Sequence, residues 1–458
     1  MMAMFSLQDV LDATGAKILQ ANADSFAGVV TDTRKVTEGA LFLGLKGDRF
    51  NGEDFAHEAA KKGAAGIIVS STCPADKLAG IRATLLCVPD TLVAYQGLAH
   101  AWRMRFTLPV VAITGSNGKT TTKDLAAATL SPLGPILKTQ ANFNNEVGLP
   151  LTLLGIREKH KAAVVEIGMR GLHQIEAMAP IAAPSVGIVT NVGETHMELL
   201  GSIENIARAK AELVEAIPSG GTVILNADNE YVAAMRDKAR EGVRVLTFGI
   251  THDADIRARD IVTRAMSATR FTVDYAGGAH AFLMPMLGHH NVYNALAAIA
   301  ASHALGVDPE AASDGLRHFE ATKMRFETED LGDWHIVNDA YNASPMSMQA
   351  AIQTLAGIVP GRKIAVMGDM LELGSISESA HRKVGQELAL YGFDAVVTRG
   401  AMGAFIADGA EAGGIRQVYR CASHEEAADR LHAILQPGDT ILFKGSRGMA
   451  MEKIIHLL

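Results

Sequence analysis

The sequence predicts an α/β protein of three domains, and three observations support this prediction. The chain has 458 residues, enough for about three domains at roughly 150 residues each. Short apolar segments alternate with helical patterns along its length, which is typical of parallel sheets covered by helices. One apolar strand runs into a glycine-containing turn that ends in Gly-Lys-Thr. We therefore expect a small α/β N-terminal domain, a central P-loop-type domain and a Rossmann-like C-terminal domain.

We place the N-terminal domain at residues 1–88, the central domain at 89–322 and the C-terminal domain at 323–458. The N-terminal domain has strand-like segments GVVTDT, ALFLGL, AAGIIVS and TLLCVP and the helical pattern EDFAHEAAKKG. The expected strands of the central domain are VVAITG, PILKT, AAVVEIGM, VGIVTNV and TVILNAD. They predict a mostly parallel sheet with flanking helices. The C-terminal domain repeats the alternation with DWHIVNDAY, RKIAVMGDM, FDAVVTRG and DTILFKGSRG.

The composition limits the classes of protein to which the chain can belong. The formal net charge of −8, without a run of basic residues, argues against nucleic-acid binding. Cys73, Cys87 and Cys421 are scattered, and their spacing indicates neither a disulfide framework nor a zinc site. Asp9 and Asp12 interrupt the region where a signal peptide would be apolar, and no apolar stretch of about 18 residues is present. We therefore expect a cytoplasmic protein without membrane insertion.

The segment LPVVAITGSNGKTTT predicts a phosphate-binding turn. Gly115 and Gly118 allow a tight turn whose N–H groups face a phosphate, and the helix that follows contributes the positive end of its dipole. Lys119 can reach the β and γ phosphates, and the Thr120 hydroxyl can bind Mg²⁺. The loop is a shorter form of the P-loop, because Ile113 stands where the eight-residue pattern has glycine. The alternative interpretation is an ordinary strand–turn–helix corner.

Three more residues have a chemistry that their sequence surroundings do not explain. Glu166 ends the strand AAVVEIGM, at the edge where parallel α/β sheets bind ligands, and could share a Mg²⁺ with Thr120. It could equally be a solvated carboxylate. Lys210 falls on the apolar stripe of the helix ENIARAKAELVEAI, where it either snorkels to solvent or reacts as a desolvated amine to form a metal-binding carbamate. His196 could supply an imidazole to the same ion, or it is an ordinary polar loop residue.

Two further segments combine polar residues with helix starts. GHHNVYNALAA opens an otherwise apolar helix, where side-chain amides could read a purine edge, and NDAYNASPMSM follows an expected strand. The polar residues of the two segments are His290, Asn291, Asn294, Asp339, Tyr341, Asn342 and Ser344. Polar helix caps and turns are the alternative for both segments. A third segment, KGSRGMAMEK, repeats the strand–turn–helix arrangement and adds Lys444 and Arg447, so a second anion site is possible there.

Together and in this order, the motifs resemble the Mur ligase family, the ATP-dependent amide-forming enzymes of peptidoglycan synthesis. The motifs that carry the resemblance are TGSNGKTTT, the carboxylate of VVEIGM, NVGETHMELLGS, the lysine of ARAKAEL, GHHNVYNALAA, KMRFE and NDAYNASPMSM. Four segments most resemble the branch that joins D-alanyl-D-alanine to UDP-N-acetylmuramoyl-tripeptide: TQANFNNEVGLPLTLL, DAYNASPMSM, VMGDMLELG and KGSRGMAMEK. The opening VTDTRKVTEGALFLGLKGDRFNGEDF is similar to the family's uridine-nucleotide-binding domain.

The resemblance implies an enzyme that uses ATP to activate a carboxylate as an acyl phosphate, which an amine then attacks. The implied substrates are UDP-N-acetylmuramoyl-tripeptide and D-alanyl-D-alanine. The implied cofactors are ATP, Mg²⁺, with two ions expected, and a carbamate on Lys210. Lys119, His196 and Lys210 are the implied catalytic residues, and closure of the C-terminal domain would exclude water. A monomer is expected.

The resemblance also assigns roles to individual positions. Thr120 and Glu166 would hold one Mg²⁺, while His196 and a carbamylated Lys210 would support a second. The implied nucleotide-binding residues are Gly115, Ser116, Asn117, Gly118, Lys119, Thr120, Thr121, Asn291, Asn294, Arg325 and Asp339. The implied substrate-binding residues are Thr33 and Arg34 for the uridine nucleotide and Asn342 and Ser344 for the dipeptide. Tyr341 departs from the pattern, because a branch of the family has lysine there, and no phosphate-contacting role is carried over to it.

Two rival interpretations remain. One is another amide ligase on the same scaffold, such as a family member that adds a diamino acid or a relative of folylpolyglutamate synthetase. The chain lacks a DNPR-like motif for the distal end of a diamino acid. The other rival is a P-loop ATPase or nucleotide-binding scaffold whose outer domains serve protein contacts, which leaves Lys210 on an apolar stripe unexplained.

Overall fold

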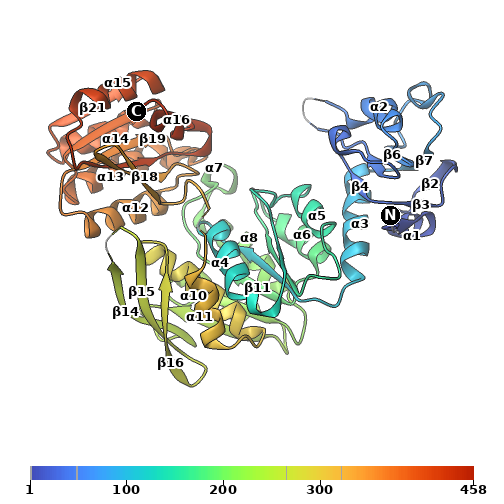
Figure 1. The fold of residues 1–458 in the computed structure, drawn as a ribbon, viewed down its shortest axis with the longest axis horizontal. Helices are drawn as coiled ribbons and strands as arrows, with labels where there is room; N and C mark the ends of the chain where they lie inside the picture. Colours follow the sequence, from blue (N-terminus) through green and yellow to red (C-terminus); the bar gives the residue numbers. More distant parts are fainter. Residues whose placement is uncertain (1–2, 48–49, 265, 321) are drawn as a thin grey trace. The chain divides into compact units, whose positions relative to one another are not determined.

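The structure is a computed structural model that describes residues 3–47, 50–264, 266–320 and 322–458. The chain, drawn from blue at the N-terminus to red at the C-terminus in Figure 1, falls into two compact units. The first unit comprises Met1–Leu108, Thr139–His160 and Ala177–Ala183, and the second comprises Pro109–Lys138, Lys161–Glu176 and Pro184–Leu458. The predicted boundary between residues 88 and 89 stays a prediction.

The first unit is built on a small, mostly parallel sheet. Its strand order is β2–β7–β6–β5–β4, and only the edge strand β2 runs antiparallel to its neighbour. The strands are β2 (Lys17–Gln20), β4 (Val29–Val30), β5 (Leu41–Leu43), β6 (Gly66–Ser70) and β7 (Thr84–Val88), with β1 (Phe5–Ser6) and β3 (Ser25–Phe26) forming a separate pair. The helices are α1 (Leu7–Thr14), α2 (Ala56–Lys61), α3 (Thr91–Met104) and α5 (Gly148–Leu153). The segment predicted to be a small α/β domain therefore has that architecture.

A buried arginine holds α3 to the segment around residue 182 in this unit. The Arg103 side chain donates hydrogen bonds to the carbonyl oxygens of Ala182 at 3.0 Å, Phe106 at 2.7 Å and Leu108 at 3.1 Å. Arg103 is only 7 % exposed, so these carbonyls satisfy a cation that would otherwise be costly to bury. The helix α6 (Gln174–Ala182) ends at this point.

The second unit contains a nine-stranded sheet that places the candidate site. Its order is β16–β15–β14–β13–β12–β11–β8–β10–β9, parallel from β9 to β14 and antiparallel over β14, β15 and β16. The strands are β8 (Val110–Thr114), β9 (Ile136–Lys138), β10 (Ala162–Glu166), β11 (Val186–Val189), β12 (Thr222–Asn226), β13 (Arg244–Gly249), β14 (Ile256–Arg264), β15 (Ala268–Tyr275) and β16 (Gly278–Met284). The mostly parallel sheet is as predicted, whereas the strands from β13 to β16 were not identified from the sequence.

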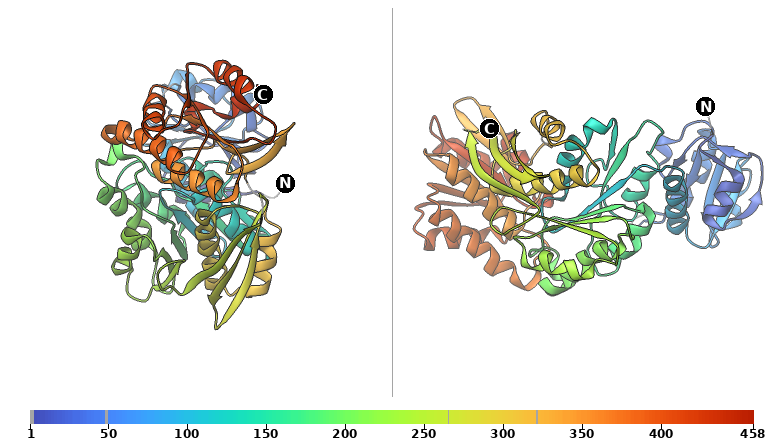
Figure 2. Two further views of the ribbon diagram at one scale, coloured as in Figure 1. Left: turned by 90° about the vertical axis from the view of Figure 1, so that its left-hand side faces the viewer. Right: turned by 90° about the horizontal axis from the view of Figure 1, so that it is seen from below.

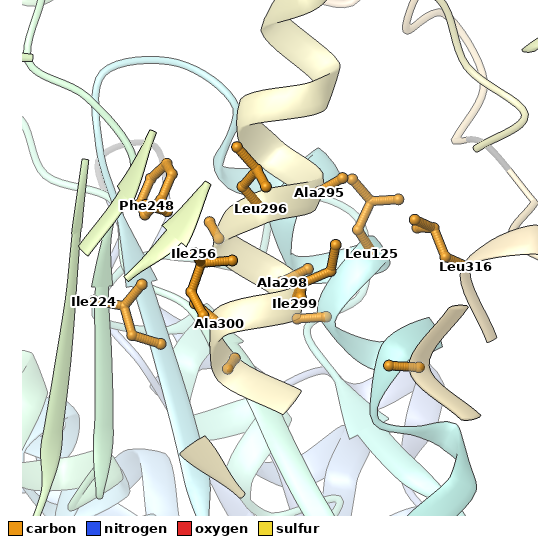
Figure 3. Close-up of a cluster of buried hydrophobic side chains, with 14 of the residues drawn as sticks. Leu125, Ile224, Phe248, Ile256, Ala295, Leu296, Ala298, Ile299, Ala300 and Leu316 are labelled. Carbon is orange, nitrogen blue, oxygen red and sulfur yellow. The ribbon is translucent and has the colours of Figure 1, made fainter. Parts of the chain in front are cut away.

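The core of this sheet forms under the long helix α10 (His289–Ala304). Leu296 and Ile299 of α10 are fully buried in one cluster with Ile224, Phe248 and Ile256 of the strands (Figure 3). Each large apolar side chain buried in this way contributes roughly 1.5–3 kcal/mol. The remaining helices are α4 (Lys119–Thr129), α7 (Met197–Leu200), α8 (Ile203–Ala216), α9 (Glu230–Ala233) and α11 (Pro309–Arg317). Because α4 also packs on α10, the helix after the phosphate-binding turn belongs to this core.

The second unit also contains a six-stranded sheet of order β17–β18–β22–β19–β20–β21. This C-terminal part of the chain is drawn in orange to red (Figure 2). Only β17 is antiparallel to its neighbour. The elements are β17 (Glu327–Leu331), β18 (Trp334–Asp339), α12 (Pro345–Ile358), β19 (Lys363–Gly368), α13 (Ser377–Leu390), β20 (Ala395–Arg399), α14 (Gly403–Ala412), β21 (Gln417–Cys421), α15 (His424–Ile434), β22 (Thr440–Lys444) and α16 (Glu452–Ile455).

The faces of this C-terminal sheet carry two separate cores. Leu442 belongs to one core and its neighbours in sequence, Ile441 and Phe443, belong to the other, as the alternation of side chains along a strand requires. Parallel strands covered on both faces are the predicted Rossmann-like arrangement. The α/β fold class is confirmed. Within the described ranges, no helix is long and apolar enough to cross a lipid bilayer.

Candidate nucleotide and metal site

The predicted phosphate-binding turn joins β8 to α4 at the carboxyl edge of the parallel strands. Gly115 has a φ of 148°, and a Cβ there would lie 1.9 Å from Thr190 Oγ1. Gly118 has a φ of 80°, and a Cβ there would lie 2.2 Å from Asn294 Oδ1. Both positions therefore require glycine, for space as well as for backbone conformation.

The loop after β11 holds the first half of the turn. The N–H of Ser116 donates to Asn191 O and the N–H of Asn117 donates to Asn191 Oδ1, both at 2.9 Å. Ser116 Oγ donates to Gly193 O, also at 2.9 Å. The first N–H groups of α4 have no partner within the helix, and they are the donors that remain for a phosphate.

Lys119 folds back over the turn. Its Nζ donates to the carbonyl oxygens of Gly115 at 2.7 Å and Ser116 at 3.3 Å. Burial lowers the pKa of Lys119 below its ordinary value, and Arg325 lowers it further, while Glu166 opposes this change. Lys119 and Arg325 are thus two cationic groups close to the turn, as an anionic ligand requires.

Thr120 and Glu166 lie together, as predicted. Thr120 Oγ1 donates to Glu166 Oε2 at 3.0 Å, and the two residues are 6 % and 2 % exposed. Arg325 Nη2 donates to Thr120 Oγ1 at 3.0 Å. A hydroxyl and a carboxylate are the hard oxygen ligands that Mg²⁺ prefers, so these residues fit the predicted ion. Neighbouring Thr121 is buried in α4.

Lys210 is buried, which agrees with its predicted place on the apolar stripe of α8. The residue is 2 % exposed, and in the described part of the chain its Nζ has no hydrogen bond or salt bridge. Burial places the pKa of Lys210 well below its ordinary value, and the charge of Lys119 lowers it further. The alternative that the side chain snorkels to solvent therefore does not hold.

His196 has a left-handed backbone with φ of 56°, and its Nδ1 lies 2.6 Å from Glu372 Oε2. Burial lowers the pKa of His196, and the charges of Lys119 and Lys210 act in the same direction while Glu372 opposes them. The predicted residues are therefore within electrostatic reach of one another. Among the described residues, no group of three or more His, Cys, Asp or Glu side chains could hold a metal ion.

The predicted asparagines of α10 brace the helix against the turn. Asn294 Nδ2 donates to Asn291 Oδ1 at 3.1 Å, and Asn291 Nδ2 donates to Leu287 O at 2.9 Å. Thr122 Oγ1 donates to Asn294 Oδ1 at 3.3 Å. These amides have protein partners, so the predicted contact with a purine stays a prediction.

Asp228, just after β12, was not identified from the sequence. Its carboxylate accepts hydrogen bonds from the N–H groups of Ile250 at 2.6 Å and His252 at 2.7 Å, and from the Tyr293 hydroxyl at 2.7 Å. Burial opposes its ionisation, but the N–H groups of Ile250 and Thr251 outweigh burial and hold the pKa of Asp228 well below its ordinary value. The sequence signal was weaker here, because Asp228 lies beyond the end of β12, whereas Glu166 is the last residue of β10.

Arg325 reaches Thr120 from an unusual stretch of backbone. Met324 and Phe326 on either side have φ values of 60° and 54°, a conformation that costs about 1 kcal/mol or more for such residues. The guanidinium carbon of Arg325 lies 4.1 Å from the centre of the Tyr341 ring. Tyr341, to which no phosphate-contacting role was carried over, therefore supports the arginine.

The predicted residues of the segment NDAYNASPMSM are held by internal contacts. Asp339 Oδ2 lies 2.5 Å from Lys444 Nζ, and the N–H of Phe326 donates to Asp339 Oδ1 at 3.2 Å. Ser344 caps α12, and its hydroxyl donates to Asn117 Oδ1 at 2.8 Å. Asn342 offers its carbonyl oxygen to Lys444 at 3.1 Å. Binding of the nucleotide by Asp339 and of the dipeptide by Asn342 and Ser344 stays a prediction.

Thr33 and Arg34, the predicted uridine-nucleotide residues, belong to the first unit. They lie in the short 3₁₀ helix η1 (Thr33–Lys35). The Arg34 side chain is 85 % exposed and pairs with Asp32 at 2.7 Å, and Lys62 Nζ donates to Thr33 O at 3.2 Å. Their role stays a prediction.

The buried turn at the carboxyl edge of a parallel sheet, with Lys119 above it and the Thr120–Glu166 pair beside it, defines a P-loop-type nucleotide-binding protein. Comparison with known proteins narrows this class. Residues 25–102 match the catalytic domain of the Mur ligase family, residues 113–302 the Mur ligase middle domain, and residues 324–447 the Mur ligase glutamate ligase domain.

Individual relatives agree with these matches over nearly the whole chain. The UDP-N-acetylmuramoyl-tripeptide–D-alanyl-D-alanine ligase of Bacillus subtilis is 40 % identical, covering 93 % of this chain and 92 % of its own. MurF from Acinetobacter baumannii has a TM-score of 0.90 at 31 % identity, covering 99 % and 98 % of the two chains. MurF from Thermotoga maritima, solved in complex with ADP, has a TM-score of 0.83 at 27 % identity, covering 94 % and 96 %. The chain belongs to the Mur ligase family, as its motifs predicted.

Proposed function

We propose that this chain is an ATP-dependent amide ligase that joins D-alanyl-D-alanine to UDP-N-acetylmuramoyl-tripeptide through an acyl phosphate, in cytoplasmic peptidoglycan precursor synthesis. The supporting observation is the convergence of Lys119, Thr120, Glu166 and Arg325 at one edge of the sheet. The related UDP-N-acetylmuramoyl-tripeptide–D-alanyl-D-alanine ligases support the identities of the two substrates. The family relationship supports activation of a carboxylate by ATP.

The residues of the turn suit transfer of a phosphoryl group to a carboxylate. A carboxylate is a poor acyl donor, so its oxygen must first attack the γ phosphorus and release ADP. The N–H groups of α4 and the cations of Lys119 and Arg325 offset the negative charge on the transferring group. Bound Mg²⁺ supplies further charge neutralisation, with Thr120 and Glu166 as its proposed ligands. The dipeptide amine then attacks the acyl phosphate, forms the amide and expels phosphate.

A second Mg²⁺, held by His196 and a carbamylated Lys210, is part of the proposal. A carbamate forms when a neutral amine adds to CO₂ and releases a proton, and the burial of Lys210 favours the neutral amine by lowering its pKa. The resulting carbamate would be anionic, which suits a position next to the cation of Lys119. His196 would provide a nitrogen ligand to the same ion.

The remaining assignments also follow the family pattern. Residues 1–88 would bind the uridine nucleotide through the segment with Thr33 and Arg34. Residues 89–322 would bind ATP, with Asn291 and Asn294 toward the adenine. Residues 323–458 would close over ATP through Arg325 and Asp339 and receive the dipeptide. We propose that the enzyme acts as a monomer.

The role of Lys210 has a direct test. Lys210→Ala should lower the rate of ligation by more than about a hundredfold, because it removes a metal-supporting group. Short-chain carboxylates added to the assay should restore part of the rate by occupying the place of the carbamate. Lys238→Ala, which removes a lysine that is 59 % exposed, serves as the matched control and should leave the rate unchanged. Full activity of Lys210→Ala would remove the carbamate from the proposal.

The function as a whole is tested by phosphate release from ATP. The purified protein is given Mg²⁺, UDP-N-acetylmuramoyl-tripeptide and one amine at a time: D-alanyl-D-alanine, L-lysine, meso-diaminopimelate, L-glutamate or none. Turnover that requires both the nucleotide-tripeptide and D-alanyl-D-alanine is the expected result. Turnover with a diamino acid or with glutamate would instead support the rival ligases, and equal turnover in every reaction would support an ATPase.

A further inference from the structure

The segment VMGDMLELG carries a glutamate that no role described above uses. This segment spans the end of β19 and the loop that follows, and it brings Glu372 to His196, 176 residues away in sequence. The contact is 2.6 Å between Glu372 Oε2 and His196 Nδ1. An ionised carboxylate has no proton to donate, so a hydrogen bond to it requires a proton on the ring nitrogen that faces Glu372.

The backbone on both sides of this contact is unusual. His196 has a φ of 56° and Glu372 a φ of 63°, values that non-glycine residues adopt only when the surrounding structure imposes them. The N–H of Glu198 also donates to the carbonyl oxygen of Glu372 at 3.3 Å. At Gly374, a Cβ would lie 3.0 Å from the Cα of Glu198 in α7, so the two segments approach closely at a position without a side chain.

Fixed hydrogen bonds hold the loop that carries Glu372. The buried His381 of α13 accepts from the N–H of Met370 at 2.8 Å through Nε2, and its Nδ1 lies 2.6 Å from Ser377 O. Ser446 Oγ accepts from the N–H of Leu371 at 2.9 Å. These bonds hold the two residues that precede Glu372, so Glu372 is presented by a supported backbone rather than by a free segment.

Stability alone does not account for the pair. The Glu372 side chain is 41 % exposed and that of His196 is 25 % exposed. A hydrogen-bonded pair with this much solvent contact contributes little to folding. The pair can instead control the tautomer of His196, because a proton fixed on Nδ1 leaves Nε2 as the nitrogen with a free electron pair.

We infer that Glu372 is a positioning residue for His196: by holding the proton on Nδ1, it fixes the tautomer and the ring orientation in which Nε2 serves the reaction site. A carboxylate or carbonyl that orients a functional histidine commonly changes metal affinity or activity 10- to 100-fold when removed. This inference rests on the proposed function for its kinetic consequence, but not for the tautomer itself.

The tautomer is measured without substrates, by ¹⁵N resonances of histidine rings in the full-length protein. The His196 signals are assigned by their loss in His196→Gln. We expect a protonated Nδ1 and an unprotonated Nε2 in the unsubstituted protein, with a shift toward the Nε2–H form in Glu372→Ala. An unchanged tautomer in Glu372→Ala would overturn the inference, whatever the ligation rate.

Kinetics with D-alanyl-D-alanine and the nucleotide-tripeptide provide the second measurement. Glu372→Ala should lower kcat by about 10- to 100-fold with little change in KM for the nucleotide-tripeptide. Glu372→Gln, whose amide oxygen still accepts from Nδ1–H, should recover most of this loss. In a His196→Gln background, Glu372→Ala should have no further effect, because its action passes through the imidazole. Independent losses in the double variant would contradict the positioning role.

The matched control is Glu378→Ala. It removes a carboxylate of α13 that pairs with Arg382 at 3.3 Å and should leave both tautomer and kcat unchanged. If the unsubstituted protein shows no ligation while the tautomer shifts as expected, the proposed function fails and the structural inference stands. If the unsubstituted protein catalyses ligation and Glu372→Ala has the same kcat, the inference fails and the proposed function stands.

Discussion

Two strand–turn–helix segments of the second unit have similar sequences and different structures. In the first, β8 leads through GSNGKT into α4, a helix of 11 residues. In the second, β22 leads through KGSRG into the 3₁₀ helix η7 (Arg447–Met449) and the four-residue helix α16. Both segments have glycines and cations in the turn, and the sequence suggested an anion site in each.

The pairing of the cations distinguishes the two. Lys119 is hydrogen-bonded to backbone carbonyls, and no carboxylate of the described residues forms a salt bridge with it. Lys444 is paired with Asp339, and Arg447 with Glu452 at 2.8 Å. A cation already paired with a carboxylate attracts an anion less strongly. We therefore interpret the second segment as a structural contact and call its Asp339–Lys444 pair the brace. A glycine turn with a lysine is thus insufficient evidence for phosphate binding until the partner of the lysine is known.

The largest expected effect comes from the first turn. Lys119→Met keeps most of the side-chain length but removes the charge that would face the transferring phosphoryl group. We expect kcat/KM for ATP to fall about a thousandfold or more, measured by phosphate release in the complete ligation assay. Lys123→Met is not a suitable control, because Lys123 is itself buried beside Asp124. Lys238→Met, which replaces an exposed lysine, is a suitable control. Equal activity of Lys119→Met and Lys238→Met would show that the lysine of the first turn does not act on phosphate.

The brace should show its effect in stability. Asp339→Ala leaves Lys444, whose side chain is 3 % exposed, without its carboxylate partner. An unpaired buried charge of this kind costs about 3 kcal/mol or more in the free energy of unfolding, which urea denaturation of the purified protein would report. Replacing both residues, as in Asp339→Leu with Lys444→Met, should restore much of that loss. A single variant as stable as the unsubstituted chain would show that the pair is not a brace.

Tyr341 should have an intermediate effect, transmitted through Arg325. Tyr341→Leu removes the ring under the guanidinium, and a partly buried cation–π contact of about 1.4 kcal/mol corresponds to a tenfold fall in kcat/KM for ATP. Tyr341→Phe keeps the ring and should retain nearly full activity. If Tyr341→Phe loses as much kcat/KM for ATP as Tyr341→Leu, the hydroxyl rather than the ring face of Tyr341 is responsible.

Arg447 should have the smallest effect. Its side chain is 51 % exposed, so its pair with Glu452 is worth at most about 1 kcal/mol. Arg447→Gln should therefore change the urea midpoint little and leave KM for ATP within about twofold. A marked rise in KM for ATP would mean that the second turn also meets an anion, and the two segments would then be alike.

The sequence revealed those parts of the site in which one residue contradicts its own surroundings. Lys210 on an apolar stripe and Glu166 at the end of an apolar strand are anomalies within a single element, and the structure buries both. The glycines of the first turn were also recognised locally, because a tight turn needs positive φ values that glycine adopts without strain. The alternation of strands and helices was sufficient to predict the fold class, since each strand or helix shows its own periodicity of apolar residues.

The parts that were missed depend on contacts between distant segments. Glu372 has no unusual neighbours in sequence, and only the fold brings it to His196. Asp228 gains its importance from the N–H groups of residues 250–252, which lie beyond the next strand. The antiparallel strands β14, β15 and β16 pair with one another rather than through crossover helices, so the βα alternation that identified the other strands was absent.

The close approach of Gly118 and Asn294 limits how this enzyme could acquire resistance to an inhibitor of its nucleotide site. Any side chain at position 118 would collide with Asn294 Oδ1, and losing that amide would remove the partners of Thr122 Oγ1 and Asn291 Oδ1. Neither position can therefore change alone without damage, and at position 118 the φ of 80° disfavours a side chain even when Asn294 is replaced. Fewer single substitutions would give resistance to a compound that binds Gly118 and Asn294 than to one that binds the exposed Arg34.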